Sequence, residues 1–524
     1  MIRPQTTLLA VLLASILLYL PLLESDFTNW DDPAQVLENP NVIGFSPGKI
    51  PDIFSTTVVS EYHPLITLLY GVEYRIFGPS GFFFHLGNLV WHLLNVSLLF
   101  LLLRRLGISR GLAYLAGCAL FALHPFQVAT LGWVSARKDL VCTAFTLLAI
   151  LAYLSEKSPW RNALVIVFTL LALLAKAVAA TIPLVLLGLE LSRPRKGWKR
   201  ELRWLLLLLA VGAVFGFLAL QLQPIKPGRE NPGSGAIFPA ARALIFYLGR
   251  FLFPLHLSTI YPELPGEYVF LPANLLRVMG ATGILLLATA AFLRKGGAHR
   301  LAAWGIFLAL LNLIPVLRLV PFGGEEIVAP RFCYLPLTGI AVALAFLLEK
   351  HPPGETAKSF LGLILLGFLL GNLAYQEAWR NGTIFWETAL ARYPAYPIAH
   401  HQLGDAHWRA GRVAEAAAAC ASARELDPGL EKAWLGEAVS LWTLGRRREA
   451  LAVLVEGRGE LQRRKKERGA EVLRRCWEEY RAQLELEPSE VPPTQDENSR
   501  TDQEAPGPDQ VGDQGPKAPA AAQL

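Results

Sequence analysis

In the stretch LLAVLLASILLYLPLLESDFTNWDD (residues 8–32), a long apolar run ends at Leu23 and is followed within a few residues by two adjacent carboxylates. About 20 apolar residues are needed to cross the ~30 Å hydrocarbon core of a bilayer. Comparable runs recur along the chain, for example LLLLLAVGAVFGFLAL at 205–220. The 524 residues are 53% hydrophobic but only 18% charged, whereas soluble domains carry about 25% charged residues. The sequence therefore predicts a polytopic membrane protein.

The distribution of charges and cysteines bears on which partners and ligands such a membrane protein could have. The net charge of +6 comes from Lys and Arg in short segments between the apolar runs, which is typical of membrane topology and not of nucleic-acid binding. The five cysteines include no CxxC pair, so neither a disulfide framework nor a zinc site is predicted. The first run has a basic start at Arg3 but no small-x-small cleavage site before Glu24. We therefore expect a retained span instead of a signal peptide.

Hydropathy predicts about eleven transmembrane helices and a definite orientation. The spans are 6–23, 82–103, 111–128, 140–154, 161–176, 178–191, 204–222, 272–292, 301–317, 332–348 and 359–375. With the N-terminus in the cytoplasm, the cytoplasmic connections are RRLGISR, SEKSPWR, SRPRKGWKRELR, RKGGAHR and EKHPPGETAK. These segments are basic or nearly so, as the positive-inside rule requires. The odd count then places the C-terminal region outside the cytoplasm. We expect the protein to lie in the cell inner membrane or the plasma membrane.

Two extracytoplasmic connections are long, residues 24–81 and 223–271. Each contains a moderately apolar piece with internal charge, HPLITLLYGVEYRIFG at 63–78 and ARALIFYLGRFLFPLHL at 241–257. The charges make a further span unfavourable. We therefore expect both pieces to form helices that lie in the membrane interface.

The character of the sequence changes after the transmembrane domain (1–375). Between 381 and 487, residues 34 apart correspond: Gly404 to Ala438, Gly411 to Gly445, and Ala416 to Ala450. A 34-residue period is typical of tetratricopeptide (TPR) helix-turn-helix repeats. Residues 488–524 are rich in Pro, Gly, Asp and Gln and are predicted to be disordered. The expected fold is thus all-α, with a C-terminal, extracytoplasmic TPR domain.

Charged residues gather at the predicted outer ends of the spans. Asp31 and Asp32 are either solvated loop carboxylates or functional groups that act as a general base or bind the acceptor. Arg137, Lys176 and Arg331 lie at a depth where a cation needs a partner. An anionic lipid phosphate would satisfy them, and so would neighbouring acids such as Asp139, Glu325 and Glu326. His63, His124 and Glu325 are further candidates for substrate contacts.

Several motifs together resemble one family of membrane enzymes. They are NWDDPAQVLENPNV, YHPLITLLYGVEYRIFGPSGFFFHLGNLVWHLLN, LFALHPFQVATLGWVSARKDL, LLAKAVAATIPLVLL, APRFCYLPLTG and WRNGTIFWETALARYP. In this order they resemble the transmembrane and tetratricopeptide-repeat containing O-mannosyltransferases and their bacterial relatives, which have the GT-C fold. The resemblance covers roughly residues 1–460.

The resemblance implies an inverting transferase that takes a sugar, with mannose the natural candidate, from a polyprenyl-phosphate carrier at the outer face. The acidic pair of the first outer loop, here Asp31 or Asp32, would supply the catalytic base. Arg137 and Arg331 occupy matching basic positions, where cations would stabilise the phosphate leaving group. His63 stands where the family commonly has Arg. The TPR repeats would hold an acceptor protein in a concave groove.

Two other functions also fit parts of this pattern. A membrane-anchored TPR scaffold for envelope proteins would share the architecture without catalysis. A transporter or flippase for a lipid-linked sugar is disfavoured, because inner span halves such as LLFLLL and LVLLGL are almost purely apolar. No spacing of Asp, Glu, His or Cys marks a metal site, so neither a metal nor a cofactor is predicted, and the lipid-linked sugar is treated as a substrate.

Overall fold

The computed structural model is almost entirely helical in the residues that it describes. These are residues 4–156, 158–193, 198–222, 237–262, 276–283, 297–317, 326 and 328–486. Within these ranges, the only extended pairings are two isolated β-bridges, Val58–Glu61 and Pro262–Glu326. The all-α class expected from the sequence is confirmed. The chain divides into two units, Met1–Thr388 and Ala389–Leu524.

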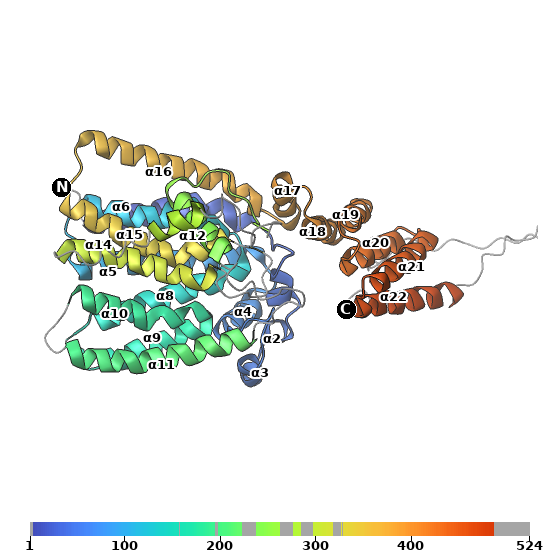
Figure 1. The fold of residues 1–524 in the computed structure, drawn as a ribbon, viewed down its shortest axis with the longest axis horizontal. Coiled ribbons are helices and arrows are strands. Elements are labelled where there is room, and N and C mark those ends of the chain that lie inside the picture. Colours follow the sequence, from blue (N-terminus) through green and yellow to red (C-terminus); the bar gives the residue numbers. More distant parts are fainter. Residues whose placement is uncertain are drawn as a thin grey trace, which may run out of the picture. The chain divides into compact units, whose positions relative to one another are not determined.

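Unit 1 contains the predicted membrane spans (Figure 1). Its helices are α1 (Pro4–Tyr19), α2 (Pro40–Ile43), α3 (Ile50–Ser55), α4 (Pro64–Phe77), α5 (Gly81–Leu106), α6 (Gly111–Leu123), α7 (Val128–Leu131), α8 (Arg137–Tyr153), α9 (Arg161–Ala175), α10 (Ile182–Ser192), α11 (Trp198–Leu222), α12 (Ile237–Leu252), α14 (Gly297–Leu313), α15 (Tyr334–Lys350), α16 (Glu355–Gln376) and the start of α17 (Gly382–Arg392).

Seven helical segments in the described residues are long and apolar enough to cross a membrane. They are Pro4–Glu24, Gly81–Leu106, Gly111–Leu131, Glu201–Leu218, His299–Val316, Pro330–Lys350 and Glu355–Trp379. Two shorter apolar segments, Arg161–Ala175 and Ala177–Ser192, and helix α8 match three further predicted spans. The predicted span 272–292 lies mostly outside the described residues, so the count of eleven stays a prediction.

Small residues allow a close approach of two helices in unit 1. Gly305 of α14 faces Gly339 of α15, and a Cβ atom on either glycine would collide with the backbone of the other. Small residues at such crossings are typical of membrane helices, because close backbone approach maximises van der Waals contact. Helices α14 and α15 are therefore held as a tight pair.

The connections between the helices of unit 1 lie at two opposite ends. At one end, the Glu349 carboxylate accepts hydrogen bonds from the backbone N–H groups of Ser109 and Arg110, and Arg161 pairs with Glu201 at 3.0 Å. These residues belong to the basic connections, whereas α2, α3 and α4 of the first long loop lie at the opposite end (Figure 1). The two sets of connections are thus separated as the alternation of spans requires. Which end faces the cytoplasm stays a prediction.

Both moderately apolar loop pieces are helical. Helix α4 buries Ile66, Thr67 and Tyr70 on one side, while Ile76 remains 64% exposed on the other. Helix α12 likewise buries Leu244 and Tyr247. Each helix therefore has one face against the protein, as an interfacial helix would. Their position in a bilayer stays a prediction, as does the structure of residues 263–271, which lie outside the described residues.

Unit 2 consists of paired helices with repeating turns. Its helices are the end of α17, α18 (Pro397–Arg409), α19 (Val413–Leu426), α20 (Glu431–Thr443), α21 (Arg447–Arg463) and α22 (Glu467–Leu486). Gly411 and Gly445 lie in the turns that follow α18 and α20, and both have φ of 76°, a left-handed conformation that favours glycine. Gly404 faces Cys420, where a Cβ atom would come within 2.6 Å of the sulfur. Residues that correspond at a spacing of 34, such as Gly411 and Gly445, thus occupy equivalent positions in successive helix pairs.

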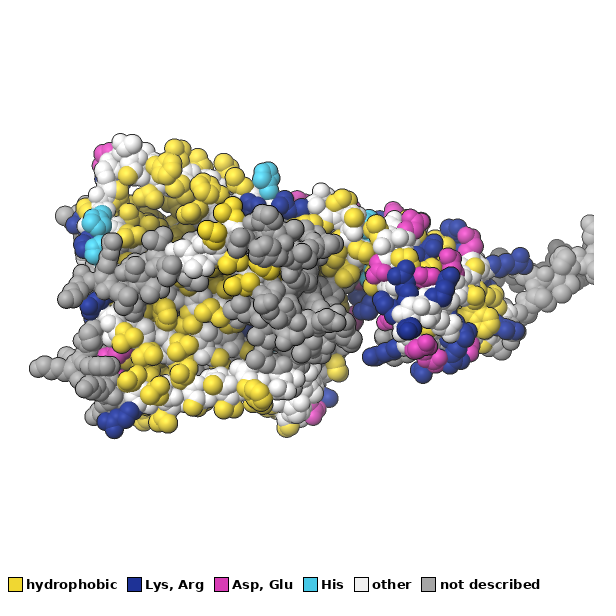
Figure 2. Space-filling model, in the orientation of Figure 1, with side chains coloured by type: hydrophobic (Ala, Val, Ile, Leu, Met, Phe, Trp, Pro, Cys, Tyr) yellow, Lys and Arg dark blue, Asp and Glu magenta, His cyan; other side chains and the backbone are white. Residues whose placement is uncertain are grey.

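Surface chemistry distinguishes the two units. In Figure 2, hydrophobic side chains dominate the visible helices of unit 1, while charged side chains of both signs crowd unit 2. An apolar outer surface suits contact with lipid, and a mixed charged surface suits water. Residues 488–524, predicted to be disordered, lie outside the described residues.

Candidate functional site

Asp32 is buried and is used as a structural anchor. One carboxylate oxygen accepts hydrogen bonds from the backbone N–H and the hydroxyl of Thr28, both at 2.9 Å. The other oxygen accepts from the backbone N–H of Ser135 at 2.9 Å and from its hydroxyl. Ser135 lies 103 residues further along, in the turn Val134–Ala136 that precedes α8. Asp32 therefore fastens the first loop to the start of α8.

We expect Asp32→Asn to destabilise unit 1. An amide nitrogen cannot accept from the N–H groups that face Asp32, and an unsatisfied buried donor costs about 1–3 kcal/mol. A lower thermal unfolding temperature of the purified protein would show this loss. Thr443→Val, which removes a hydroxyl in unit 2 that donates to the Val439 carbonyl, is the matched control. An unchanged unfolding temperature for Asp32→Asn would contradict the anchoring role.

Asp31, the other member of the pair, is chemically available. Its carboxyl is half-buried and has no hydrogen-bond partner within the described parts of the chain. Burial raises its pKa to about 6, although the cations Lys138 and Arg331 act to lower it. A carboxyl group whose pKa lies close to neutral pH, and which makes no hydrogen bond in the described structure, can accept a proton as a general base. Of the two predicted catalytic acids, the geometry favours Asp31.

Two cations, Lys138 and Arg331, act on Asp31, and a third, Lys176, acts on the neighbouring Glu61; each cation is held by one acid. Lys138 of α8 pairs with Glu61 of the first loop. Lys176, between α9 and α10, pairs with Asp139 at 2.6 Å, and Arg331 pairs with Glu326 at 2.7 Å. Phe332 joins two of them, because its ring lies under Lys176 at 5.1 Å and under Arg331 at 4.8 Å. Loops distant in sequence thus build one charged cluster.

Tryptophan rings border this cluster. The Arg331 guanidinium lies 4.5 Å from the centroid of the Trp133 ring, a cation–π contact. Trp30, next to Asp31 in the chain, stacks on Trp386 at 5.0 Å and lies 6.1 Å from Trp133. Trp386 is fixed by a hydrogen bond from its indole N–H to Asn29. The aromatic rings give the cluster a rigid apolar edge beside the acid.

Arg137, one of the predicted phosphate ligands, is sealed inside the protein. Its side chain has 0% exposure and donates to Asn88, to the Phe84 carbonyl and to Glu73. The Tyr70 ring covers it at 5.1 Å. All three guanidinium nitrogens are thus used by the fold. Phosphate binding by Arg137 stays a prediction, which this geometry does not favour, whereas Lys176 and Arg331 lie in the cluster.

The remaining predicted residues fall into different places. His63 lies next to the cluster, 4.0 Å from Glu61 and 3.3 Å from the Gln35 amide; burial lowers its pKa to about 4, so it is neutral near pH 7. His124 is fully buried, 3.3 Å from the Phe251 carbonyl, and accepts from the Phe126 N–H, so it supports a turn. Glu325 lies outside the described residues.

Sequence patterns could not identify Glu61, Thr28 or Ser135 as members of the site. Ser135 stands in the motif LFALHPFQVATLGWVSARKDL without any feature that marks it, and Thr28 and Glu61 lie just outside the quoted family motifs. The contacts of Glu61 with Lys138 and of Ser135 with Asp32 join residues 77 and 103 positions apart. In the described residues, no three His, Cys, Asp or Glu side chains form a group that could hold a metal ion. The prediction that no metal binds stays untested.

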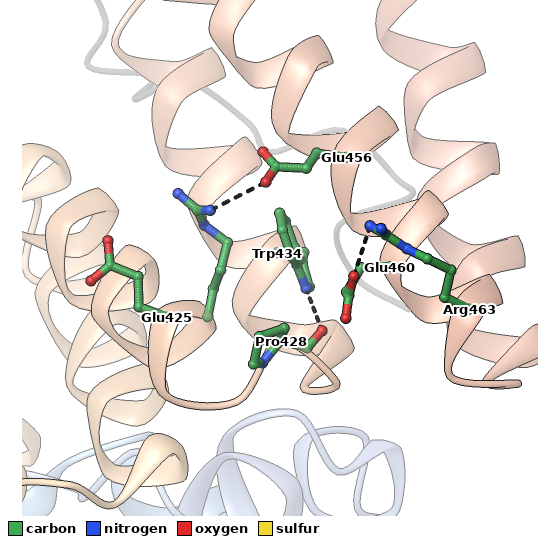
Figure 3. Close-up of a pocket in the computed structure, with 7 residues that line it drawn as sticks. Glu425, Pro428, Trp434, Glu456, Glu460 and Arg463 are labelled. Atoms are coloured by element: carbon green, nitrogen blue, oxygen red, sulfur yellow. Dashed lines mark hydrogen bonds and ion pairs between the residues drawn. The ribbon is translucent and has the colours of Figure 1, made fainter.

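A hollow lies in unit 2 (Figure 3). It is lined by Arg424, Glu425, Pro428, Trp434, Glu456, Glu460 and Arg463. Arg424 donates to Glu437 at 2.6 Å, Arg463 pairs with Glu460 at 2.8 Å, and the Trp434 indole donates to the Pro428 carbonyl. Arg424 and Glu437 join α19 to α20, and Arg463 and Glu460 pair within α21, so these groups are used by the fold. The candidate site is therefore the cluster in unit 1.

This fold and site define a helical membrane protein with a carboxylate and cations at one end of unit 1, and sequence comparison finds relatives that are named protein O-mannosyl-transferases. The chain is 23% identical over 449 residues to protein O-mannosyl-transferase F38B6.6 of Caenorhabditis elegans. This match covers 81% of this chain and 63% of the relative. It is 33% identical over 186 residues to protein O-mannosyl-transferase Tmtc1 of Drosophila melanogaster, covering 33% and 21%. No family model matches. The resemblance noted in the motifs is confirmed.

The chain is shorter than these relatives, spanning less than two thirds of the length of each. Among solved structures, it has a TM-score of 0.41 and 16% identity with the arabinofuranosyltransferase AftD from Mycobacteria, covering 74% of this chain and 29% of AftD. With ArnT from Cupriavidus metallidurans, the TM-score is 0.26 and the identity 14%, over 65% of this chain and 76% of ArnT.

Proposed function

We propose that this protein is a membrane glycosyltransferase. It transfers a sugar, with mannose the first candidate, from a polyprenyl-phosphate carrier to a hydroxyl group on an acceptor protein at the extracytoplasmic face. The observation that carries this proposal is the unengaged Asp31 carboxyl beside Lys138 and Arg331. The similarity to O-mannosyltransferases supports the same class of reaction.

In the proposed mechanism, Asp31 takes the proton of the acceptor hydroxyl while the hydroxyl oxygen attacks the anomeric carbon. The bond from that carbon to the phosphate oxygen breaks, and attack from the opposite face inverts the configuration. Negative charge builds on the leaving phosphate, and fixed cations beside it lower the barrier. Lys138, Lys176 and Arg331 would supply this stabilisation.

The neighbouring groups would prepare this chemistry. Asp32 holds the loop on which Asp31 lies, through its bonds to Thr28 and Ser135. The ring of Trp133, under Arg331 at 4.5 Å, restricts the guanidinium to one orientation and limits water around it. No cofactor enters the reaction. Unit 2 would bind the acceptor protein through its helical repeats, on the same side of the membrane.

Reconstituted transfer is the direct test. The full chain, purified and placed in liposomes, is given radiolabelled mannosyl-phosphoryl-polyprenol and a mixture of exported proteins. We expect label to appear in protein from the lipid-linked donor and not from a nucleotide-linked mannose. Failure to label protein, while unit 2 still binds envelope proteins, would favour the non-catalytic TPR scaffold.

A further inference from the structure

The three acids that hold the cluster cations differ in their access to water. The side chains of Asp139 and Glu326 are 9% and 5% exposed, whereas that of Glu61 is 38% exposed. Lys138, the partner of Glu61, is only 7% exposed. Glu61 therefore covers the Lys138 ammonium from the solvent side, and it is the acid with the most room to move.

The backbone that carries Glu61 is held in an unusual conformation. Val58 and Glu61 close a four-residue turn through two backbone hydrogen bonds of 3.0 and 2.9 Å. The two central residues, Val59 and Ser60, have φ of 50° and 61°. Left-handed backbone is unfavourable for non-glycine residues and especially for a β-branched one, and such strain persists only where the surroundings hold it. The contact between Glu61 and Lys138 is one restraint that holds this turn.

A buried ammonium needs an anion beside it at every stage of a reaction cycle. The phosphodiester of a sugar–phosphate–prenyl donor carries one negative charge, the same as a carboxylate. Exchange of Glu61 for this phosphate would therefore leave the charge around Lys138 unchanged. Asp139 and Glu326, the acids of the two other ion pairs, are nearly inaccessible to water. A phosphate could not replace either of them without moving a buried acid.

We propose that Glu61 is a displaceable counter-ion, which holds Lys138 while the site is empty and leaves it when the donor phosphate binds. This inference rests on the proposed function. Glu61 acts through Lys138 and is a positioning residue: it tunes the affinity for phosphate and returns to Lys138 as the phosphate product departs. Part of the donor's binding energy is used to open the Lys138–Glu61 pair.

Binding of farnesyl phosphate to the full chain in detergent tests this role, followed by the fluorescence of tryptophans beside the cluster. We expect Glu61→Gln to lower the Kd by roughly threefold to tenfold, because a competing like charge is removed. Glu61→Ala serves as a second variant. Glu377→Gln is the matched control, since it removes the same charge from an acid that is 62% exposed in a surface pair; its Kd should equal that of the wild type.

The coupling to Lys138 is tested by a double-mutant cycle. In a Lys138→Gln background, Glu61→Gln should change the Kd by less than about twofold. An equal or higher Kd for both Glu61 variants, in protein that unfolds at the wild-type temperature, would overturn the inference. The same decrease in Glu377→Gln would also overturn it, by showing a general charge effect. Failure of the wild type and all variants to bind farnesyl phosphate would instead refute the proposed function on which the inference rests.

Discussion

Asp31→Asn is expected to lower sugar transfer by about 10²–10⁴-fold, the usual contribution of a general base, without loss of folded protein. An amide cannot take the proton of the acceptor hydroxyl. Nothing in the described structure hydrogen-bonds to the Asp31 carboxyl, and burial raises its pKa, which means that the fold disfavours its charge. Removal of this charge should therefore not lower the unfolding temperature. Transfer from a labelled lipid donor and thermal unfolding of the same preparation measure the two effects.

The pH dependence of the wild type gives an independent check on Asp31. With a pKa raised to about 6 by burial, the carboxyl is charged at pH 7 and becomes protonated as the pH falls below 6. The protonated form cannot accept the proton, so kcat/KM should fall about tenfold per pH unit on the acid side. A profile that stays flat from pH 7 to pH 5, or full activity of Asp31→Asn, would refute the assignment of the base.

Elements governed by local sequence pattern were predictable. Hydropathy placed ten of the eleven predicted spans on apolar helical segments of the described residues, because a segment that crosses a bilayer must be apolar along its whole length. The 34-residue period predicted equivalent turns, and Gly411 and Gly445 do share a positive φ of 76°. The charges at the predicted outer ends of the spans also indicated that the cations there have acidic partners, since a cation at that depth needs one. Arg331 and Lys176 do lie in one cluster with acids.

The sequence could not show which residue of each adjacent charged pair serves the fold and which belongs to the candidate site. Asp31 and Asp32 are neighbours, and their different environments depend on Ser135, which is distant in the chain. Arg137 and Lys138 begin the same helix, where successive side chains point about 100° apart. One is turned into the packing of α4 and α5, and the other toward Glu61. Only the tertiary fold assigns one cation to structure and the other to the site.

Arg137→Ala is expected to prevent accumulation of folded protein. The change leaves the Glu73 carboxylate, the Asn88 side-chain oxygen and the Phe84 carbonyl without their donor. Loss of one partner from a buried ion pair costs about 3–5 kcal/mol, a large fraction of the stability of a typical domain. The yield of monodisperse protein in detergent and its unfolding temperature measure the effect. Arg380→Ala, in a pair whose side chains are both at least 60% exposed, is the matched control and should behave like the wild type.

A second variant separates the structural role of Arg137 from the phosphate-binding role that the family resemblance implies. Arg137→Met combined with Glu73→Gln removes both charges and keeps much of the side-chain volume, and replacement of a whole buried ion pair is often tolerated. If Arg137 serves the fold, this double variant should recover both folded protein and sugar transfer, with a KM for the lipid donor close to that of the wild type. Recovery of folding without transfer, or with a strongly raised donor KM, would show instead that the guanidinium binds the phosphate. That outcome would require α4 and α5 to separate around Arg137 when the donor enters, because its nitrogens are occupied in the present structure.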